Sequence, residues 1–140
     1  MIDEFTRECL AIEVDFSLPG ERVVRILERL LWCHGKPDSL VLDNGPEFTG
    51  KAFFSWAESN KVTLNFIRPG KPKENAICES FNGRFRDECL NENWFLSIDG
   101  AREITEQWRQ DYNTLRPHGA LCKMPPSVFA EKFYAQKSSA

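Results

Sequence analysis

Two short apolar segments, at residues 39–42 and 62–66, enclose a segment with helical periodicity, and this order constrains the fold most strongly. In the second apolar segment, large apolar residues alternate with polar ones, which is the two-residue period of a β-strand. Between the strands, Phe53 and Ala57 recur at helical spacing, and Thr49 is placed to cap that helix. A strand, a helix and a second strand in this order are typical of an α/β protein.

The rest of the chain continues the alternation of strands and helices. The sequence predicts further elements in this order: a strand over residues 9–14, a helix that ends before Gly35, a break at residues 68–73, a helix over residues 75–90, a helix from a Ser97 cap to Pro117, and a last helix that starts near Pro126. We therefore expect a small sheet with helices packed against it. The expected domain covers residues 1–134 and is followed by a disordered tail at residues 135–140.

The composition excludes several classes of protein. The five cysteines form no CxxC pair and are odd in number, which argues against a disulfide framework and against a thiolate zinc site. No apolar run approaches the roughly 20 residues that span a bilayer, and no segment resembles a signal peptide. We expect a cytoplasmic protein in a reducing compartment, with no membrane partner.

Positive charge is concentrated in the middle of the chain. The net charge is −3, which by itself does not indicate a nucleic-acid-binding protein. Residues 61–90, however, hold six basic and four acidic residues, so a polyanion is expected to approach there. The tryptophans are expected to lie mostly in the core, although an exposed one is suited to stacking on a flipped base; they are Trp32, Trp56, Trp94 and Trp108.

Two carboxylates stand at positions suited to metal chemistry. Asp43 directly follows the strand at residues 39–42, where open α/β sheets place their ligands. Glu79 lies one turn into the helix that follows the basic break. Such a pair is suited to Mg²⁺, which takes few protein carboxylates and completes its shell with water and phosphate oxygens.

The neighbours of Glu79 support this interpretation. Asn75, Asn82 and Arg86 lie at offsets of −4, +3 and +7 from Glu79, so they share its helical face. The basic residues of the preceding break are Lys71 and Lys73. A face with a carboxylate, amides and an arginine beside a basic loop suits the binding of a metal ion and a DNA backbone together, although an ordinary solvated face has the same residue types.

Three segments resemble one known family. LVLDNGPEFTG, NFIRPGKPKENAICESFNGRFRDECLN and DYNTLRPHGAL are similar to the catalytic cores of DDE transposases, in the bacterial insertion-sequence group that resembles retroviral integrases. The resemblance covers nearly the whole chain. It implies a ribonuclease-H-like mixed sheet flanked by helices, and a homo-oligomer that acts on transposon ends and target DNA in the bacterial cytoplasm.

The resemblance also implies a mechanism and roles for individual residues. In such cores, three carboxylates bind two Mg²⁺ or Mn²⁺ ions, which clamp the attacking and leaving oxygens of a phosphodiester during cleavage and strand transfer. Asp43 and Glu79 match two of the three carboxylates. The residues expected to contact DNA are Asn44, Lys71, Lys73, Asn75, Asn82, Arg84 and Arg86.

The sequence departs from the family pattern at its amino terminus. The family's first catalytic Asp lies on a first strand upstream of the segment that MIDEFTR resembles, and that strand is absent from this sequence. Asp3 matches an acid on the second strand and not a metal ligand, and Asp15 lies at the far end of its strand. We therefore expect an amino-terminally truncated core that is impaired in cleavage and strand transfer on its own.

Two alternatives remain open at this point. One is a non-catalytic remnant of a transposase that keeps DNA-binding or oligomerising contacts. The other is a metal-dependent nuclease of the same fold that uses a different third acid, such as Glu47, although an acid in the first turn of a helix is the more ordinary role for that residue.

Overall fold

The chain forms two compact units. The computed structural model describes residues 1–140, apart from the side chain of Pro72. Asp15–Ala76 is called the central unit, because it is continuous in the sequence. Met1–Val14 and Ile77–Ala140, which flank it in the sequence, are called the outer unit. Among the helices that the structure describes, none is both long and apolar enough to cross a membrane.

A two-stranded parallel sheet organises the central unit. Strand β1 (Ser39–Leu42) pairs with β2 (Thr63–Phe66), and Leu40 lies opposite Leu64. Helix α2 (Lys51–Asn60) connects the two strands, because parallel neighbours need a crossover connection. These elements confirm the strand–helix–strand order predicted from the sequence.

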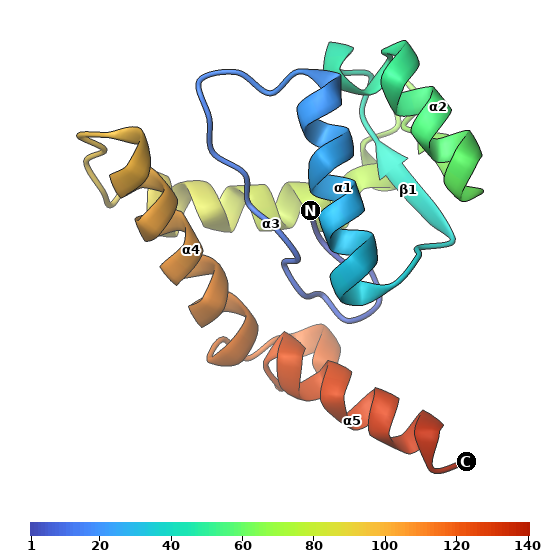
Figure 1. Ribbon diagram of the computed structural model, residues 1–140. Helices are drawn as coiled ribbons and strands as arrows, with labels where there is room; N and C mark the ends of the chain where they lie inside the picture. The colour runs from blue at the N-terminus through green and yellow to red at the C-terminus, as the bar shows by residue number, and fades with distance from the viewer. The chain divides into compact units, whose positions relative to one another are not determined.

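Helix α1 (Gly20–His34) covers the core of the central unit together with α2 (Figure 1). Gly35 follows α1 with a φ of 83°, a conformation that glycine adopts without strain, and it ends the helix where predicted. The buried apolar residues of this unit form one cluster, which comprises Val23, Leu27, Phe53, Trp56, Ala57 and Val62.

The predicted Thr49 cap of α2 is wrong. The chain first forms a short 3₁₀ helix, η1 (Pro46–Phe48), and α2 begins at Lys51 after Gly50. The Thr49 hydroxyl donates to the Pro46 carbonyl, 3.3 Å away. The N-cap position of α2 therefore falls on Gly50, which has no side chain that could cap the helix.

The outer unit is helical. Helix α3 (Ala76–Phe85), which starts at the end of the central unit, continues into a π-helical segment, η3 (Arg86–Leu90). Helix α4 (Ile98–Thr114) starts at Ser97, whose hydroxyl accepts a hydrogen bond from the Gly100 N–H at 3.0 Å, as predicted. Phe81 of α3 packs edge-on against Tyr112 of α4, with the ring centroids 5.1 Å apart.

Two shorter helices follow α4. A 3₁₀ helix, η4 (Gly119–Leu121), leads to α5 (Pro126–Ser138), which begins at Pro126 as predicted. Helix α5 continues through Ser138, so most of the segment expected to be a disordered tail is helical.

The predicted strand over residues 9–14 is wrong. Within this segment, the structure shows one antiparallel bridge, between Ile2 and Cys9. The Asn113 side chain takes the place of a neighbouring strand, because its Oδ1 accepts from the Cys9 N–H at 2.8 Å and its Nδ2 donates to the Cys9 carbonyl at 2.9 Å. A tertiary contact from α4 thus decides the conformation of this segment.

The expectation that the tryptophans build the core holds for only part of the set. Trp56 is buried, and Trp108 packs against Phe85 with the ring centroids 5.0 Å apart. Trp32 and Trp94 are instead 91% and 92% exposed. Core packing therefore does not explain these two tryptophans.

Candidate metal and nucleic-acid site

Asp43 and Asn44 lie at the carboxyl end of the small sheet. Asp43 directly follows β1 and is exposed, and its Oδ1 accepts from the Gly45 N–H at 2.9 Å. The Asn44 side-chain amide donates to the Ile67 carbonyl at 3.1 Å, just beyond the end of β2. Asn44 therefore fixes the two strand ends to each other, which is a structural role additional to any contact with DNA.

Glu47 lies close to Asp43 in the chain and in space. An ideal Cβ placed on Gly45 meets the Glu47 Oε1 at 2.7 Å, so the Glu47 carboxylate lies over the residue that binds Asp43. Both carboxylates thus flank Gly45 within the central unit. This proximity keeps Glu47 open as a further oxygen ligand.

An ion pair closes the basic loop that follows β2. The Arg68 guanidinium donates to the Glu74 carboxylate through Nε at 2.9 Å, and the Arg68 backbone N–H donates to the same carboxylate at 3.0 Å. The hydrogen bond from Arg68 lowers the pKa of Glu74. Lys71 and Lys73 lie inside this closed loop and are exposed, so both ammonium groups are available to an anion.

Glu79, Asn82 and Arg86 present one exposed face. Glu79 lies in the first turn of α3, Asn82 follows it by three residues, and Arg86 opens the π-helical segment. The opposite side of the helix is buried through Phe81. The amphipathic character predicted for residues 75–90 is therefore confirmed, with the carboxylate on the solvent side.

Arg84 does not share that face. It follows Glu79 by five residues, which places it about 140° further around a regular helix. Burial lowers the pKa of His118, and the positive charge of Arg84 lowers it further. Arg84 therefore lies towards α4 and the following turn.

The predicted site residues divide between the two units. The central unit holds Asp43, Asn44, Lys71, Lys73 and Asn75, and the outer unit holds Glu79, Asn82, Arg84 and Arg86. Asp43 and Glu79 lie at the end of β1 and in the first turn of α3, whereas Asn82 lies further along α3. Among the described residues no group of three or more His, Cys, Asp and Glu side chains is placed to hold a metal ion.

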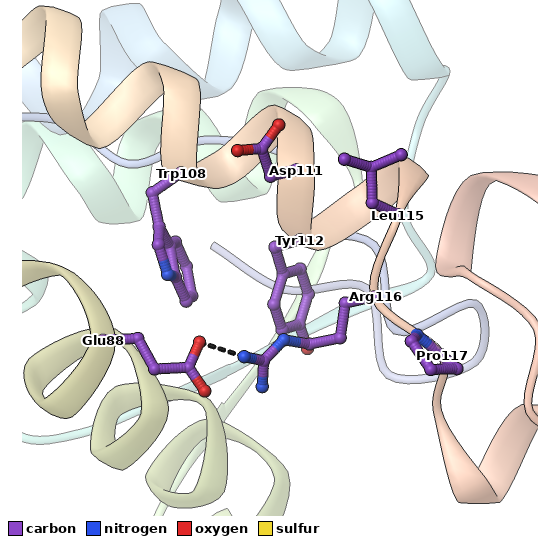
Figure 2. A pocket seen from close by; sticks show the side chains of 7 residues that line it. All are labelled: Glu88, Trp108, Asp111, Tyr112, Leu115, Arg116 and Pro117. Carbon is purple, nitrogen blue, oxygen red and sulfur yellow. Dashed lines mark ion pairs between the residues drawn. The ribbon is translucent and has the colours of Figure 1, made fainter.

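A shallow hollow lies on the outer unit, away from the Glu79 face. Trp108, Tyr112, Leu115 and Pro117 line it, and an ion pair between Glu88 and Arg116 crosses it (Figure 2). Trp108 and Tyr112 stack with their centroids 5.2 Å apart. The pair ties η3 to the segment that follows α4.

The chain matches two family models, and both describe an integrase core domain. One model covers residues 1–72 and the other covers residues 60–126. The chain belongs to the integrase core family. The resemblance to integrase cores that the sequence showed is thereby confirmed.

Relatives of this integrase core come from bacterial insertion elements. A 31.7 kDa protein of insertion element IS407 from Burkholderia multivorans is 50% identical over 96% of the chain and 49% of its own length. A 39.2 kDa protein of IS476 from Xanthomonas euvesicatoria is 44% identical over 99% of the chain and 40% of its own length. The chain thus spans about half or less of these relatives.

Solved retroviral structures share the fold. A chain of the simian T-cell lymphotropic virus intasome, solved with the PP2A regulatory subunit B56 gamma, has a TM-score of 0.74 at 18% identity over 91% of this chain and 45% of its own. The HTLV-2 integrase catalytic core domain, solved with magnesium in a trimeric form, has a TM-score of 0.69 at 17% identity over 91% and 80%. The expected fold, that of an integrase catalytic core, is therefore confirmed. The sheet that the structure describes is parallel and two-stranded, and not the mixed sheet that was expected.

Sequence reasoning missed the Arg68–Glu74 pair. The signal was present, because Pro and Gly residues between a basic and an acidic residue favour a closed turn. The same Pro and Gly residues also indicate a break between two elements, and that signal conceals the pair. The pair matters because it limits the positions that Lys71 and Lys73 can reach.

Proposed function

We propose that this integrase core supplies Asp43 and Glu79 as ligands of a divalent-metal site for DNA cleavage and strand transfer. The observation that carries the proposal is the position of the two carboxylates. Each is exposed at the end of the element where the family pattern has a metal ligand, and carboxylate oxygens are the donors that Mg²⁺ and Mn²⁺ prefer. Bound metal ions would stabilise the charge that develops on a phosphodiester.

The remaining residues act on the DNA. Lys71 and Lys73 attract the phosphate backbone from the closed loop, and Arg86 holds a phosphate beside Glu79. The proposed substrates are transposon ends and target DNA, and the working form is a homo-oligomer in the bacterial cytoplasm. Asn75 and Asn82 orient the backbone through hydrogen bonds.

A Mn²⁺ titration followed by calorimetry tests the metal site. We expect Asp43→Asn and Glu79→Gln each to raise the Mn²⁺ dissociation constant about tenfold or more, because each substitution removes one of few anionic ligands. Asp38→Asn, at an exposed acid before β1, is the matched control and should leave the constant unchanged. Parent-like Mn²⁺ binding by both site variants would refute the proposal.

A nicking assay on the ends of the insertion element tests the reaction. Cleavage should require Mg²⁺ or Mn²⁺ and should be lost in Asp43→Asn. The expectation that this chain is weakly active on its own stays a prediction, and the same assay measures it. Salt dependence of DNA binding tests the lysines, since Lys71→Gln should lower the slope by about one, whereas Lys137→Gln at the end of α5 should not.

The position of Glu47 over Gly45 favours one second candidate, a nuclease of this fold in which Glu47 is a further metal ligand. Replacing Glu47 by Gln in the same calorimetric titration separates the two candidates. Weakened Mn²⁺ binding supports the nuclease with Glu47, and unchanged binding removes it.

A further inference from the structure

Four apolar side chains are exposed in the turn between η3 and α4. Trp94 is 92% exposed and Leu96 is 95% exposed, and Leu90 and Phe95 are also exposed. We call residues 90–96 the apolar turn. Contiguous exposed apolar groups of this kind mark interaction surfaces more often than isolated ones do.

Hydrogen bonds on both sides anchor the apolar turn. The Asn91 N–H donates to the Arg86 carbonyl at 2.9 Å, and the Asn93 amide donates to the carbonyl of the buried Cys89 at 2.8 Å. The Ser97 cap then starts α4 directly after the turn. A surface that is already ordered loses less conformational entropy when it binds a partner.

The charge around the apolar turn favours a protein partner over DNA. Residues 87–101 contain four acids and no Lys or Arg. Two of these acids form ion pairs with Arg116 and Arg102, whereas Asp87 and Glu92 are exposed. Aromatic residues that stack on bases lie in positively charged grooves, so the partner of this acidic turn is a protein with an apolar, basic surface.

Helix α1 of the same chain has such a surface. Arg25, Arg29 and Trp32 lie at i, i+4 and i+7 on its exposed side, and Lys36 follows the end of the helix. Trp32 is 91% exposed. Residues 25–36 contain three Lys or Arg residues and one acid, Glu28. We call Arg25, Arg29, Trp32 and Lys36 the basic helix stripe.

We propose that the apolar turn of one copy docks on the basic helix stripe of a second copy. In this contact Trp94 and Leu96 pack against Trp32, and Glu92 approaches Arg25. One contact then covers both exposed tryptophans and pairs opposite charges. The inference rests on the part of the proposed function in which several copies act together, and it does not depend on metal binding or DNA cleavage.

Sedimentation equilibrium of the full 140-residue chain tests the apolar half of the contact. The experiment is run without DNA or metal and with a reductant, because Cys33 and Cys122 are exposed. Trp94→Ser and Leu96→Ser should each weaken self-association about tenfold or more. Leu115→Ser, at an exposed apolar residue outside the turn, should leave it unchanged. Both side chains are exposed, so the unfolding midpoints should match the parent.

A charge exchange tests the partner surface. Glu92→Arg and Arg25→Glu should each weaken self-association, and an equimolar mixture of the two variants should associate more strongly than either alone. The mixture restores opposite charges in both directions of the contact. Glu103→Arg on α4 is the matched control for a charge reversal elsewhere.

Three results would overturn the inference. The first is a parent chain that stays monomeric up to the highest concentration measured. The second is self-association of the Trp94 and Leu96 variants that equals that of the parent. The third is a mixture of the two charge variants that associates no more strongly than either variant alone. Loss of DNA binding in Trp94→Ser with unchanged association would assign the turn to base stacking instead. Because Mn²⁺ binding is measured separately, a failed metal site and a failed docking contact give different patterns of results.

Discussion

At the scale of single residues, His118 illustrates how burial changes the chemistry of a side chain. It is 7% exposed, and its ring packs edge-on against Tyr112 with the centroids 4.8 Å apart. Its Nε2 is buried and finds no hydrogen-bond partner within the described part of the chain. Burial lowers the pKa of His118, and the positive charges of Arg84, Arg116 and Arg7 lower it further.

The lowered pKa of His118 predicts a loss of stability in acid. In the unfolded chain, His118 takes up a proton near its ordinary pKa of 6.5, whereas in the folded chain its pKa is lower. Neutral His118 therefore contributes its full stabilisation of the fold above pH 6.5. That stabilisation is lost as the pH falls below this value, because the unfolded chain then binds the additional proton. His118→Gln should flatten the fall in the free energy of unfolding from about pH 7.5 to about pH 5.5, measured by urea unfolding. The exposed His34, replaced by Gln, is the control. A parent-like slope in His118→Gln would contradict the prediction.

At the scale of elements, the sequence predicted what local patterns encode and failed where distant contacts decide. The alternation at residues 62–66 and the Ser97 cap are local signals, and both were confirmed. The apolar segment at residues 9–14 carries the same strand signal, yet Asn113, more than a hundred residues away, satisfies the Cys9 backbone. Hydrophobic pattern alone therefore did not decide between a strand and a segment anchored by a helix.

Helix propensity alone predicts that replacing Gly20 of α1 by Ala raises the free energy of unfolding. The contact between α1 and η1 predicts the opposite. A Cβ on Gly20 would lie 2.9 Å from the Glu47 backbone carbonyl, whereas a Cβ on Gly83 of α3 meets nothing within 4 Å. Gly83→Ala should therefore raise the free energy of unfolding by about 0.5–1 kcal/mol. Gly20→Ala should lower it by about 1–3 kcal/mol, because the helix must shift to relieve the clash. Thermal unfolding of the two variants beside the parent measures both changes, and stabilisation by Gly20→Ala would contradict this account.

At the scale of the whole molecule, the candidate site depends on two units that fold around separate cores. The sequence placed Asp43 after a strand and Glu79 in the first turn of a helix, and both local positions were confirmed. Thirty-five residues lie between them, and each belongs to a different unit. No periodicity or capping signal encodes how two units are arranged. The proposed shared ion is therefore tested by a measurement that reports on both units.

Hydrogen exchange provides that measurement, because a metal ion bound by both carboxylates links the stabilities of the two units. Added Mn²⁺ should slow amide exchange in peptides around Asp43 and in peptides of α3 around Glu79, since a ligand stabilises every element whose opening releases it. In Asp43→Asn the protection should disappear from the α3 peptides as well, although the substituted residue lies in the other unit. Asp38→Asn should keep both effects. Protection confined to one unit, or α3 protection that survives in Asp43→Asn, would mean that the two carboxylates do not act on the same ion.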